Sequence, residues 1–166
     1  MRVLLIRHGA AEYQKAFAKS GEPDEKRPLT RAGRDQMRAV ARGLKPVVKD
    51  IDVLATSPLT RARQTADVAA ERFDEPRRET IAALVPGAPF SAFVEWLRQH
   101  EDDDLVAAVG HNPHISELAT WLMGAGQPID MKKASALLLE LGDEIGEGKG
   151  QLRWYMTPKQ LSALGE

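Results

Sequence analysis

The stretch Val3-Leu4-Leu5-Ile6-Arg7-His8-Gly9 determines how the rest of this chain is interpreted. Its four apolar residues form a short continuous run, which predicts a strand buried on both faces of a sheet. Two basic side chains and a glycine follow at once, so the strand ends in groups that can bind an anion. Two further stretches repeat this design of an apolar run and then polar groups at a turn. They are Val53–Pro58, which leads to Arg61, and Ala107–Pro113, which contains His111.

Helices are predicted between the strands, because apolar residues recur there at intervals of three and four. The first helix follows the capping residue Thr30. Ser57-Pro58 and Asn112-Pro113 each place a capping residue and a proline ahead of a further helix. Another amphipathic helix is expected from Phe90 to Leu97. The apolar stripe of the first helix consists of Met37, Val40, Leu44 and Val47.

The order of these elements predicts an α/β fold in a single domain over residues 1–166. Strands that alternate with helices are typical of a mostly parallel central sheet covered by helices on both faces, which makes three layers. Two later strands, Ala134–Leu141 and Gln151–Met156, would add an antiparallel hairpin at one edge. The polar stretches Glu12–Pro28 and Arg72–Pro89 are too short to separate domains, and the first is predicted to be a long surface loop.

The composition is that of an ordinary globular protein, and it argues against several functions. Lys and Arg number 23 against 24 Asp and Glu, so the chain lacks the basic surplus that binding to nucleic acid or to an anionic membrane requires. Cysteine is absent, which excludes disulfides and thiolate metal sites. No apolar stretch approaches the length needed to span a bilayer. A cytoplasmic location is therefore expected.

The polar groups that follow the three strands are expected to meet. In an open α/β sheet the ligand binds beyond the carboxyl ends of the strands, so parallel neighbours would bring Arg7, His8 and His111 together. The helix starts at Ser57 and Asn112 would direct free N–H groups to the same place, which attracts an anion. Such a crevice suits a phosphoryl group.

The helix that follows Ser57 contributes one arginine to this crevice. Arg61 and Arg63 are two residues apart, so they project from nearly opposite sides of the helix and only one of them can reach the site. Periodicity leaves the choice open. Arg61 is slightly favoured, because it lies one turn into the helix and its side chain should lean back toward the N-terminus.

Five short blocks, in this order and at these spacings, resemble the histidine phosphatase superfamily, which includes the phosphoglycerate mutases. The length and the last block resemble its SixA-type phosphohistidine phosphatase branch, and the resemblance runs over nearly the whole chain. The blocks are Arg7-His8-Gly9, Pro28-Leu29-Thr30 with Gly33, Ser57–Thr65, Gly110–Pro113 and Arg153–Pro158.

The resemblance implies a role for each matching residue. His8 resembles the phosphoryl acceptor of the family, and Arg7, Arg61 and His111 resemble its phosphate-binding partners, which selects Arg61 over Arg63. Asn112 is expected to join the phosphate-binding set. The chemistry agrees, because a neutral imidazole is a good nucleophile toward phosphorus and nearby positive charge keeps it neutral. No metal and no other cofactor is expected, since the arginines take the place of a cation.

The sequence departs from the family in a way that points to the substrate. Many members carry a glutamate that protonates an alcohol leaving group, and here we expect that position near Ala82 or Ala83. A phosphohistidine has less need of an acid, because its ring can leave as neutral imidazole. We therefore expect a phosphohistidine on a protein of the histidine-phosphotransfer type as substrate. Glu12 and Glu79 remain possible proton donors.

Two alternative functions remain at this stage: a small-molecule phosphomonoesterase of the same superfamily, and a non-catalytic phosphate-binding module. The i,i+3 spacing of His111 and His114, with Glu117 nearby, is also that of a metal pair, but a third convincing ligand is lacking. His114 is therefore expected at the rim or surface, and His100 in a solvated acidic turn.

Overall fold

The central sheet has the strand order β3-β2-β4-β1-β5-β6 in a computed structural model that describes residues 1–166. β1 pairs in parallel with β4, β4 with β2, and β2 with β3, whereas β5 runs antiparallel to both β1 and β6. The predicted α/β fold with an antiparallel edge hairpin is confirmed. The strands are β1 (Arg2–Arg7), β2 (Val53–Thr56), β3 (Arg77–Thr80), β4 (Leu105–Gly110), β5 (Ala136–Leu141) and β6 (Gly150–Met156).

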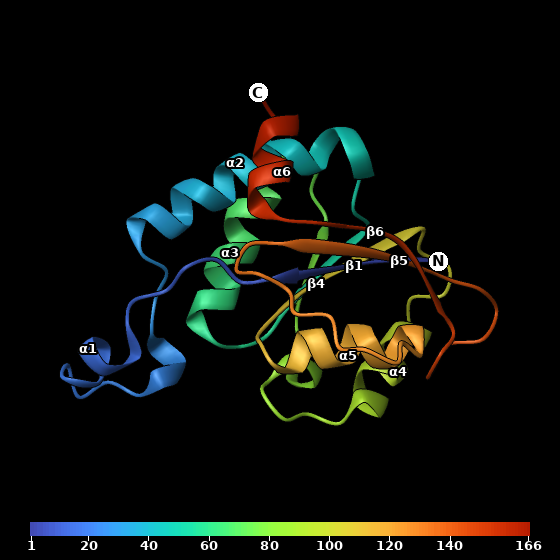
Figure 1. Ribbon diagram of the computed structural model, residues 1–166, viewed down its shortest axis with the longest axis horizontal. Coiled ribbons are helices and arrows are strands. Elements are labelled where there is room, and N and C mark those ends of the chain that lie inside the picture. Colours follow the sequence, from blue (N-terminus) through green and yellow to red (C-terminus); the bar gives the residue numbers. More distant parts are fainter.

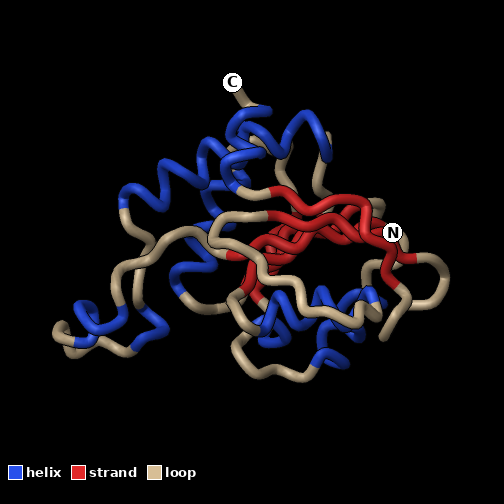
Figure 2. The backbone as a smooth tube through the Cα atoms, in the orientation of Figure 1, coloured by secondary structure: helices blue, strands red, loops and turns tan.

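Helices cover both faces of this sheet, so the domain has the three layers that the sequence predicts (Figure 1). The red strands of Figure 2 lie between two groups of helices. One face is covered by α2 (Arg31–Val48), α3 (Thr60–Ala70) and α6 (Pro158–Leu164), and the other by α4 (Phe90–Arg98) and α5 (His114–Met123).

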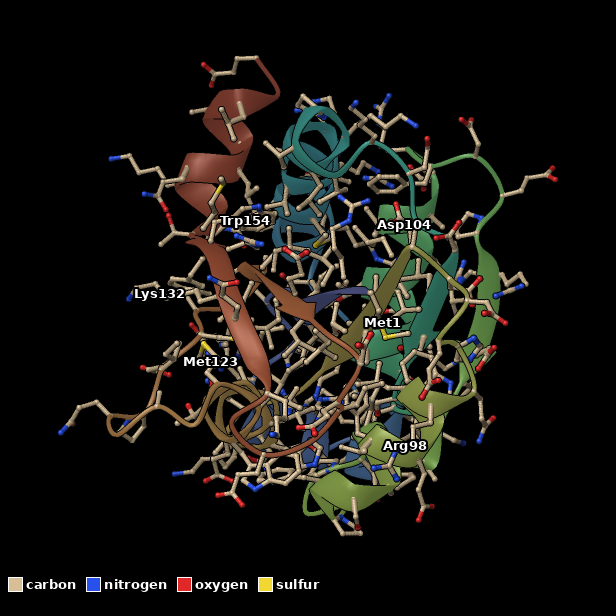
Figure 3. The ribbon with its side chains drawn as sticks, turned by 90° about the vertical axis from the view of Figure 1, so that its right-hand side faces the viewer. Met1, Arg98, Asp104, Met123, Lys132 and Trp154 are labelled. Atoms are coloured by element: carbon tan, nitrogen blue, oxygen red, sulfur yellow. The ribbon has the colours of Figure 1, made fainter.

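Each face of the sheet has its own hydrophobic core, because successive side chains of a strand point to opposite faces. Leu4 and Ile6 of β1 pack with the α2, α3 and α6 side, whereas Val3 and Leu5 pack with the α4 and α5 side. In the edge strand β6, the aromatic ring of Trp154 packs against the core on the α2, α3 and α6 side (Figure 3). The alternation explains why the inner strands are continuous apolar runs.

The structure has a strand and several helices where the sequence predicts none. β3 falls inside Arg72–Pro89, and its four residues are polar, which suits an edge strand that pairs only with β2. The C-terminal helix α6 begins with a capping box, in which Thr157 and Gln160 exchange hydrogen bonds. The stretch Glu12–Pro28 is not a plain loop, because it contains the short helix α1 (Gln14–Ala18) and the 3-10 turn η1 (Asp24–Lys26).

The two ends of that stretch are held together by hydrogen bonds. Residues 12–28, with α1 and η1, therefore form a closed loop beside the sheet, which we call the excursion. Ala11 and Leu29 form an isolated bridge, and Thr30 donates its N–H to the carbonyl of Ala10. Gly33 is required here, because a Cβ at this position would lie 2.1 Å from the Ala10 carbonyl oxygen. The block Pro28–Thr30 with Gly33 thus closes the base of the excursion.

The helix starts predicted at Pro58 and Pro113 are two residues and one residue too early, respectively. α3 begins at Thr60 and α5 at His114, and neither has a side-chain cap. The hydroxyl of Ser57 contacts His111, and the amide of Asn112 donates to the carbonyl of Met131. None of the helices is long and apolar enough to cross a membrane.

Candidate active site

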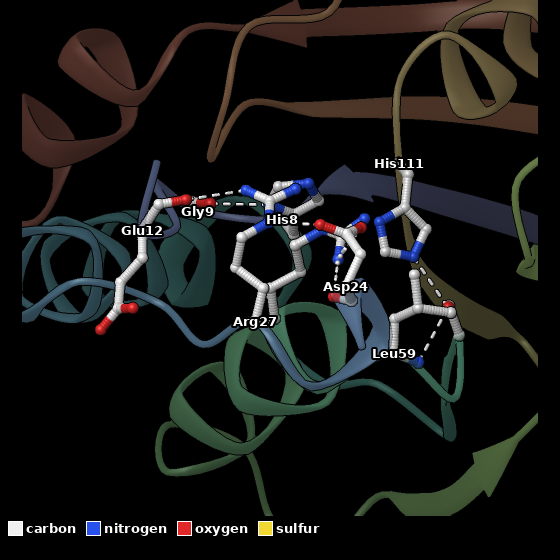
Figure 4. Close-up of polar contacts among 9 residues, drawn as sticks. His8, Gly9, Glu12, Asp24, Arg27, Leu59 and His111 are labelled. Atoms are coloured by element: carbon white, nitrogen blue, oxygen red, sulfur yellow. Dashed lines mark hydrogen bonds and ion pairs between the residues drawn. The ribbon is translucent and has the colours of Figure 1, made fainter. Parts of the chain in front are cut away.

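The candidate site lies at the carboxyl ends of three neighbouring parallel strands. His8 follows β1, Ser57 follows β2 and His111 follows β4. Backbone hydrogen bonds extend the sheet into these turns, since Ser57 N–H donates to Val109 O and His8 N–H donates to Gly110 O. The ring centroids of His8 and His111 lie 5.1 Å apart (Figure 4). The structure therefore brings the predicted imidazoles together.

The ring of His8 has a defined tautomer. Its Nδ1 lies 2.7 Å from the carbonyl oxygen of Gly9, which can only accept, so Nδ1 carries the proton and Nε2 keeps its lone pair. Burial lowers the pKa of His8 to about 4, the hydrogen bond to Gly9 opposes this, and the positive charges of Arg61, Arg7 and Arg27 add to it. At neutral pH the ring is uncharged, with one nitrogen available to attack.

The ring of His111 is oriented by Ser57. The Ser57 Oγ atom accepts from the N–H of Leu59 at 3.2 Å, so its hydroxyl proton can be donated to Nε2 of His111, which lies 2.7 Å away. When Ser57 donates in this way, the proton of His111 lies on Nδ1, a buried atom without a hydrogen-bond partner. Burial, followed by the charges of His8 and Arg61, lowers the pKa of His111 to about 3.

Two guanidinium groups belong to the same site, that of Arg61 buried and that of Arg7 partly buried. Nη1 of Arg7 donates to the carbonyl of Met131 at 2.7 Å, and Nη1 of Arg61 donates to the carbonyl of Asp24 at 3.2 Å. Burial lowers the pKa of both arginines, without making either neutral at physiological pH. Arg63 is exposed, which agrees with the choice of Arg61.

Three of the predicted site residues have a buried side-chain nitrogen without a hydrogen-bond partner. Of the five buried side-chain N or O atoms without a hydrogen-bond partner, three are Nε of Arg7, Nε of Arg61 and Nδ1 of His111. Leaving a buried donor unpaired costs about 1–3 kcal/mol each. Guanidinium and imidazole N–H groups are donors of the kind that bind the oxygens of a phosphoryl group.

Sequence reasoning missed residues that join the parts of this site. Thr65 Oγ1 accepts from the N–H of Gly9 at 3.1 Å and donates to the carbonyl of Arg61 at 2.8 Å. Its spacing of four residues from Arg61 is a signal that could have found it. Asp24 and Arg27 come from the excursion between Ala11 and Leu29, where the only signal is an i,i+3 charge pair.

Asn112 lies beside the site, but its side chain is fully engaged within the chain. Its Nδ2 donates to Asp130 Oδ1 at 3.1 Å and to the carbonyl of Met131 at 3.0 Å, and its Oδ1 accepts from Ser116. Met131 O is also the acceptor for Arg7. Asn112 therefore positions the loop at Asp130 and Met131, and the carbonyl of Met131 in turn positions Arg7.

The carboxylates of Glu79 and Glu12, the two alternative proton donors, are not directed at His8. Glu79 accepts from Trp96 Nε1 at 2.7 Å and lies 3.2 Å from Nε2 of His100. His100 is buried between Glu79 and Asp103, so the solvated acidic turn expected there is wrong. The carboxylate of Glu12 is directed away from His8 in Figure 4, and only its backbone oxygen contacts Arg27.

His114 is buried, which contradicts the rim or surface position expected from sequence. Its Nε2 lies 2.9 Å from the carbonyl oxygen of Ala88, and its ring packs against Phe90 with centroids 5.6 Å apart. His111 and His114 thus serve different partners. No group of three or more His, Cys, Asp or Glu side chains in residues 1–166 is arranged to hold a metal ion.

Comparison with known proteins agrees with this geometry. The family model described as "Histidine phosphatase superfamily (branch 1)" matches residues 3–84. An uncharacterized protein of Picosynechococcus sp. is 32% identical over 146 residues, 86% of each chain. The chain belongs to the histidine phosphatase superfamily.

Relatives within the superfamily include SixA proteins, as the resemblance indicated. Phosphohistidine phosphatase SixA of Escherichia coli is 29% identical over 164 residues, 97% of this chain and 96% of SixA. A solved structure of the protein histidine phosphatase SixA with tungstate has a TM-score of 0.84 and 26% identity, covering 97% of this chain and 99% of that one. The protein is thus a phosphatase of this superfamily with a SixA-like fold.

Proposed function

We propose that this phosphatase removes the phosphoryl group from a phosphohistidine on another protein, through a phosphorylated His8. The observation that carries the proposal is the pairing of a neutral His8, whose Nε2 lone pair is available, with three unpaired buried donors from Arg7, Arg61 and His111. The similarity to phosphohistidine phosphatase SixA supports the choice of substrate.

In the first step, Nε2 of His8 forms a bond to phosphorus while the P–N bond of the substrate breaks. The electron pair of that bond returns to the leaving nitrogen, and the substrate ring departs as neutral imidazole if its other nitrogen bears a proton. The guanidinium groups of Arg7 and Arg61 and the Nδ1–H of His111 donate to the phosphoryl oxygens. Their charge and dipoles stabilise the negative charge of the transition state.

In the second step, water attacks the phosphorus of phosphorylated His8 and the P–Nε2 bond breaks. Nδ1 of His8 stays protonated, because it donates to Gly9 O. The His8 ring therefore also leaves as neutral imidazole, and the oxygen and both protons of the water go to inorganic phosphate, which is released as H2PO4−. The contact that makes Nε2 a nucleophile also makes it a good leaving group.

The other site residues act through these groups. We assign Asn112 a positioning role on Met131 and Arg7, in place of the direct phosphate contact expected from sequence, because its own polar groups are engaged. The reaction is proposed to need no metal, since two arginines supply the positive charge.

The preference for a P–N bond rests on the residues that could donate a proton. Ala82 and Ala83 have no acidic group, Glu79 is held by Trp96 and His100, and Glu12 is directed away from His8. An alkoxide leaving group without an acid loses on the order of 10²–10⁴-fold in rate. A protein of the histidine-phosphotransfer type is the proposed partner, and the cytoplasmic location stays a prediction.

The test compares substrates with one enzyme preparation. We expect kcat/KM on a phosphorylated histidine-phosphotransfer domain to exceed that on an alkyl phosphate by about 10²-fold or more, with no change on addition of EDTA. Equal rates on both substrates would instead favour the small-molecule phosphomonoesterase. Turnover of neither would favour the non-catalytic module.

A further inference from the structure

The carboxylate of Asp24 bridges two arginines at the site. Its Oδ1 lies 2.8 Å from Nε of Arg27, and its Oδ2 lies 3.4 Å from Nη1 of Arg61. The backbone oxygen of Asp24 also accepts from the same Nη1 of Arg61 at 3.2 Å. One residue of the excursion therefore occupies a donor of the buried arginine that the proposed reaction requires.

A carboxylate in this position has the features of a bound anion. It places two oxygens on two guanidinium groups, which is the arrangement in which arginines bind phosphate. Arg61 is buried, with 7% of its side chain exposed, whereas 41% of the Asp24 side chain is exposed. The carboxylate can therefore turn toward solvent while Arg61 stays in place.

The excursion holds Asp24 at this position without preventing that movement. Its base is closed by the Ala11–Leu29 bridge, and Arg27 is tied to the backbone oxygen of Glu12 at 2.9 Å. Hydrogen bonding to Arg27, together with the charges of Arg27 and Arg61, lowers the pKa of Asp24, so the carboxylate remains charged near neutral pH. A dianion that approaches Arg61 meets this negative charge at contact distance.

We propose that Asp24 is a specificity-determining residue that competes with phosphate dianion for Arg61. Free inorganic phosphate, which brings no other contacts, is excluded from the site. A phosphoryl group on a docked protein displaces the carboxylate, because the contacts of that protein with the enzyme contribute to its binding. The inference rests on the proposed function, since it takes Arg61 as a phosphoryl ligand and a protein as the carrier of the phosphoryl group.

The experiment measures the equilibrium affinity for inorganic phosphate by isothermal titration calorimetry at neutral pH and low salt. The variant Asp24→Asn keeps the shape of the side chain and removes its charge. Glu25→Gln, at an exposed neighbouring position, removes the same charge without the contact to Arg61. We expect Asp24→Asn to bind phosphate at least about tenfold more tightly than the unaltered protein, and Glu25→Gln to stay within about twofold.

Three further measurements identify where the phosphate binds and check the result. The gain should disappear in the double variant Asp24→Asn with Arg61→Ala, because the competition is for that arginine. Asp24→Ser gives a second reading without a charge, should Asp24→Asn fail to fold. Phosphate should also inhibit turnover of a phosphohistidine protein more strongly in Asp24→Asn than in Glu25→Gln.

The outcomes separate this inference from the proposed function. Unchanged or weaker phosphate binding in both Asp24 variants would overturn the inference, as would a gain that persists without Arg61. Loss of the proposed function would appear as a failure of the unaltered protein to hydrolyse any phosphohistidine protein. The phosphate titration does not depend on that activity, so it decides the role of Asp24 in either case.

Discussion

Thr65 accepts a hydrogen bond from the backbone N–H of Gly9 at 3.1 Å, which fastens the turn that carries His8 to the helix that carries Arg61. Because the same hydroxyl donates to the carbonyl of Arg61, the proposed nucleophile and a phosphate ligand share one anchor. Their relative position therefore depends on a buried side chain that need not touch substrate.

Replacing Thr65 tests this anchor. Thr65→Val keeps the shape but leaves the N–H of Gly9 unpaired, which costs about 1–3 kcal/mol of stability. We expect kcat on a phosphohistidine protein to fall by about tenfold or more, since misplacement of reacting groups is costly. Thr65→Ser retains the oxygen and should keep most of the activity. Full activity in Thr65→Val, or a loss in Thr65→Ser as large as that in Thr65→Val, would contradict the anchoring role of the hydrogen bond.

His8→Ala should abolish turnover, because it removes the only nucleophile in the proposed mechanism. The fold should survive, since His8 lies beyond the end of β1 and outside both hydrophobic cores. Brief incubation of the unaltered protein with substrate should trap a phosphoenzyme that is labile to acid and stable to base. Turnover by the alanine variant, or a trapped phosphate on another residue, would remove His8 from this role.

Arg61→Ala should cost far more activity than Arg63→Ala. Arg61 is buried with an unpaired Nε, whereas Arg63 is exposed on the same helix and serves as the matched control. Loss of one charged donor to the transition state is worth about 3 kcal/mol, or on the order of 10²-fold in kcat/KM. Comparable losses from the two substitutions would contradict the assignment of Arg61.

The rings of His8 and His111 should remain neutral at pH values well below the ordinary imidazole pKa of 6.5. The pKa is about 4 for His8 and about 3 for His111 in the folded protein. NMR of the ring protons should therefore show no titration of either residue between pH 8 and about pH 5. Chemical shifts that titrate near 6.5 would contradict the burial of these rings.

The same depressed pKa values predict sensitivity of the fold to acid. Below pH 6.5 the two histidines bind protons in the unfolded chain, whereas His8 and His111 stay neutral in the folded protein. The free energy of unfolding is therefore highest above pH 6.5 and decreases as the pH falls toward 4 and 3. The loss is at most about 1.4 kcal/mol per pH unit for each ring. Urea denaturation should show a smaller fall between pH 6.5 and 4.5 in His111→Gln than in the unaltered protein.

The inner sheet and the core of the site could be predicted from sequence, because their signals are local. Val3–Ile6 and Leu105–Val109 are apolar runs, and the parallel order of their strands follows from the helices between them. Once those strands are neighbours, His8 and His111 must follow them at the same edge of the sheet. The meeting of the two imidazoles needed no tertiary information beyond that.

The remaining features depend on contacts distant in sequence. β3 has no apolar residue, so only its pairing with β2 makes it a strand. His100 is followed by acidic residues in sequence, yet it is buried, and its ring contacts Glu79 of the distant strand β3. Asn112 has the pattern of a helix cap, but Met131 and Asp130 compete for its amide. Local secondary-structure propensity does not decide the conformation where a residue distant in sequence forms a better hydrogen bond.

The closed base formed by Ala11, Leu29 and Gly33 separates the excursion from the sheet that carries the two imidazoles. Chain length between fastened ends changes the free energy of a loop only slowly. Residues 13–26 can therefore be shortened, lengthened or exchanged while β1, β2 and β4 keep their geometry. Such a site can evolve in two independent parts. The strand ends would preserve the chemistry, and the excursion would be free to change which molecules are admitted to it.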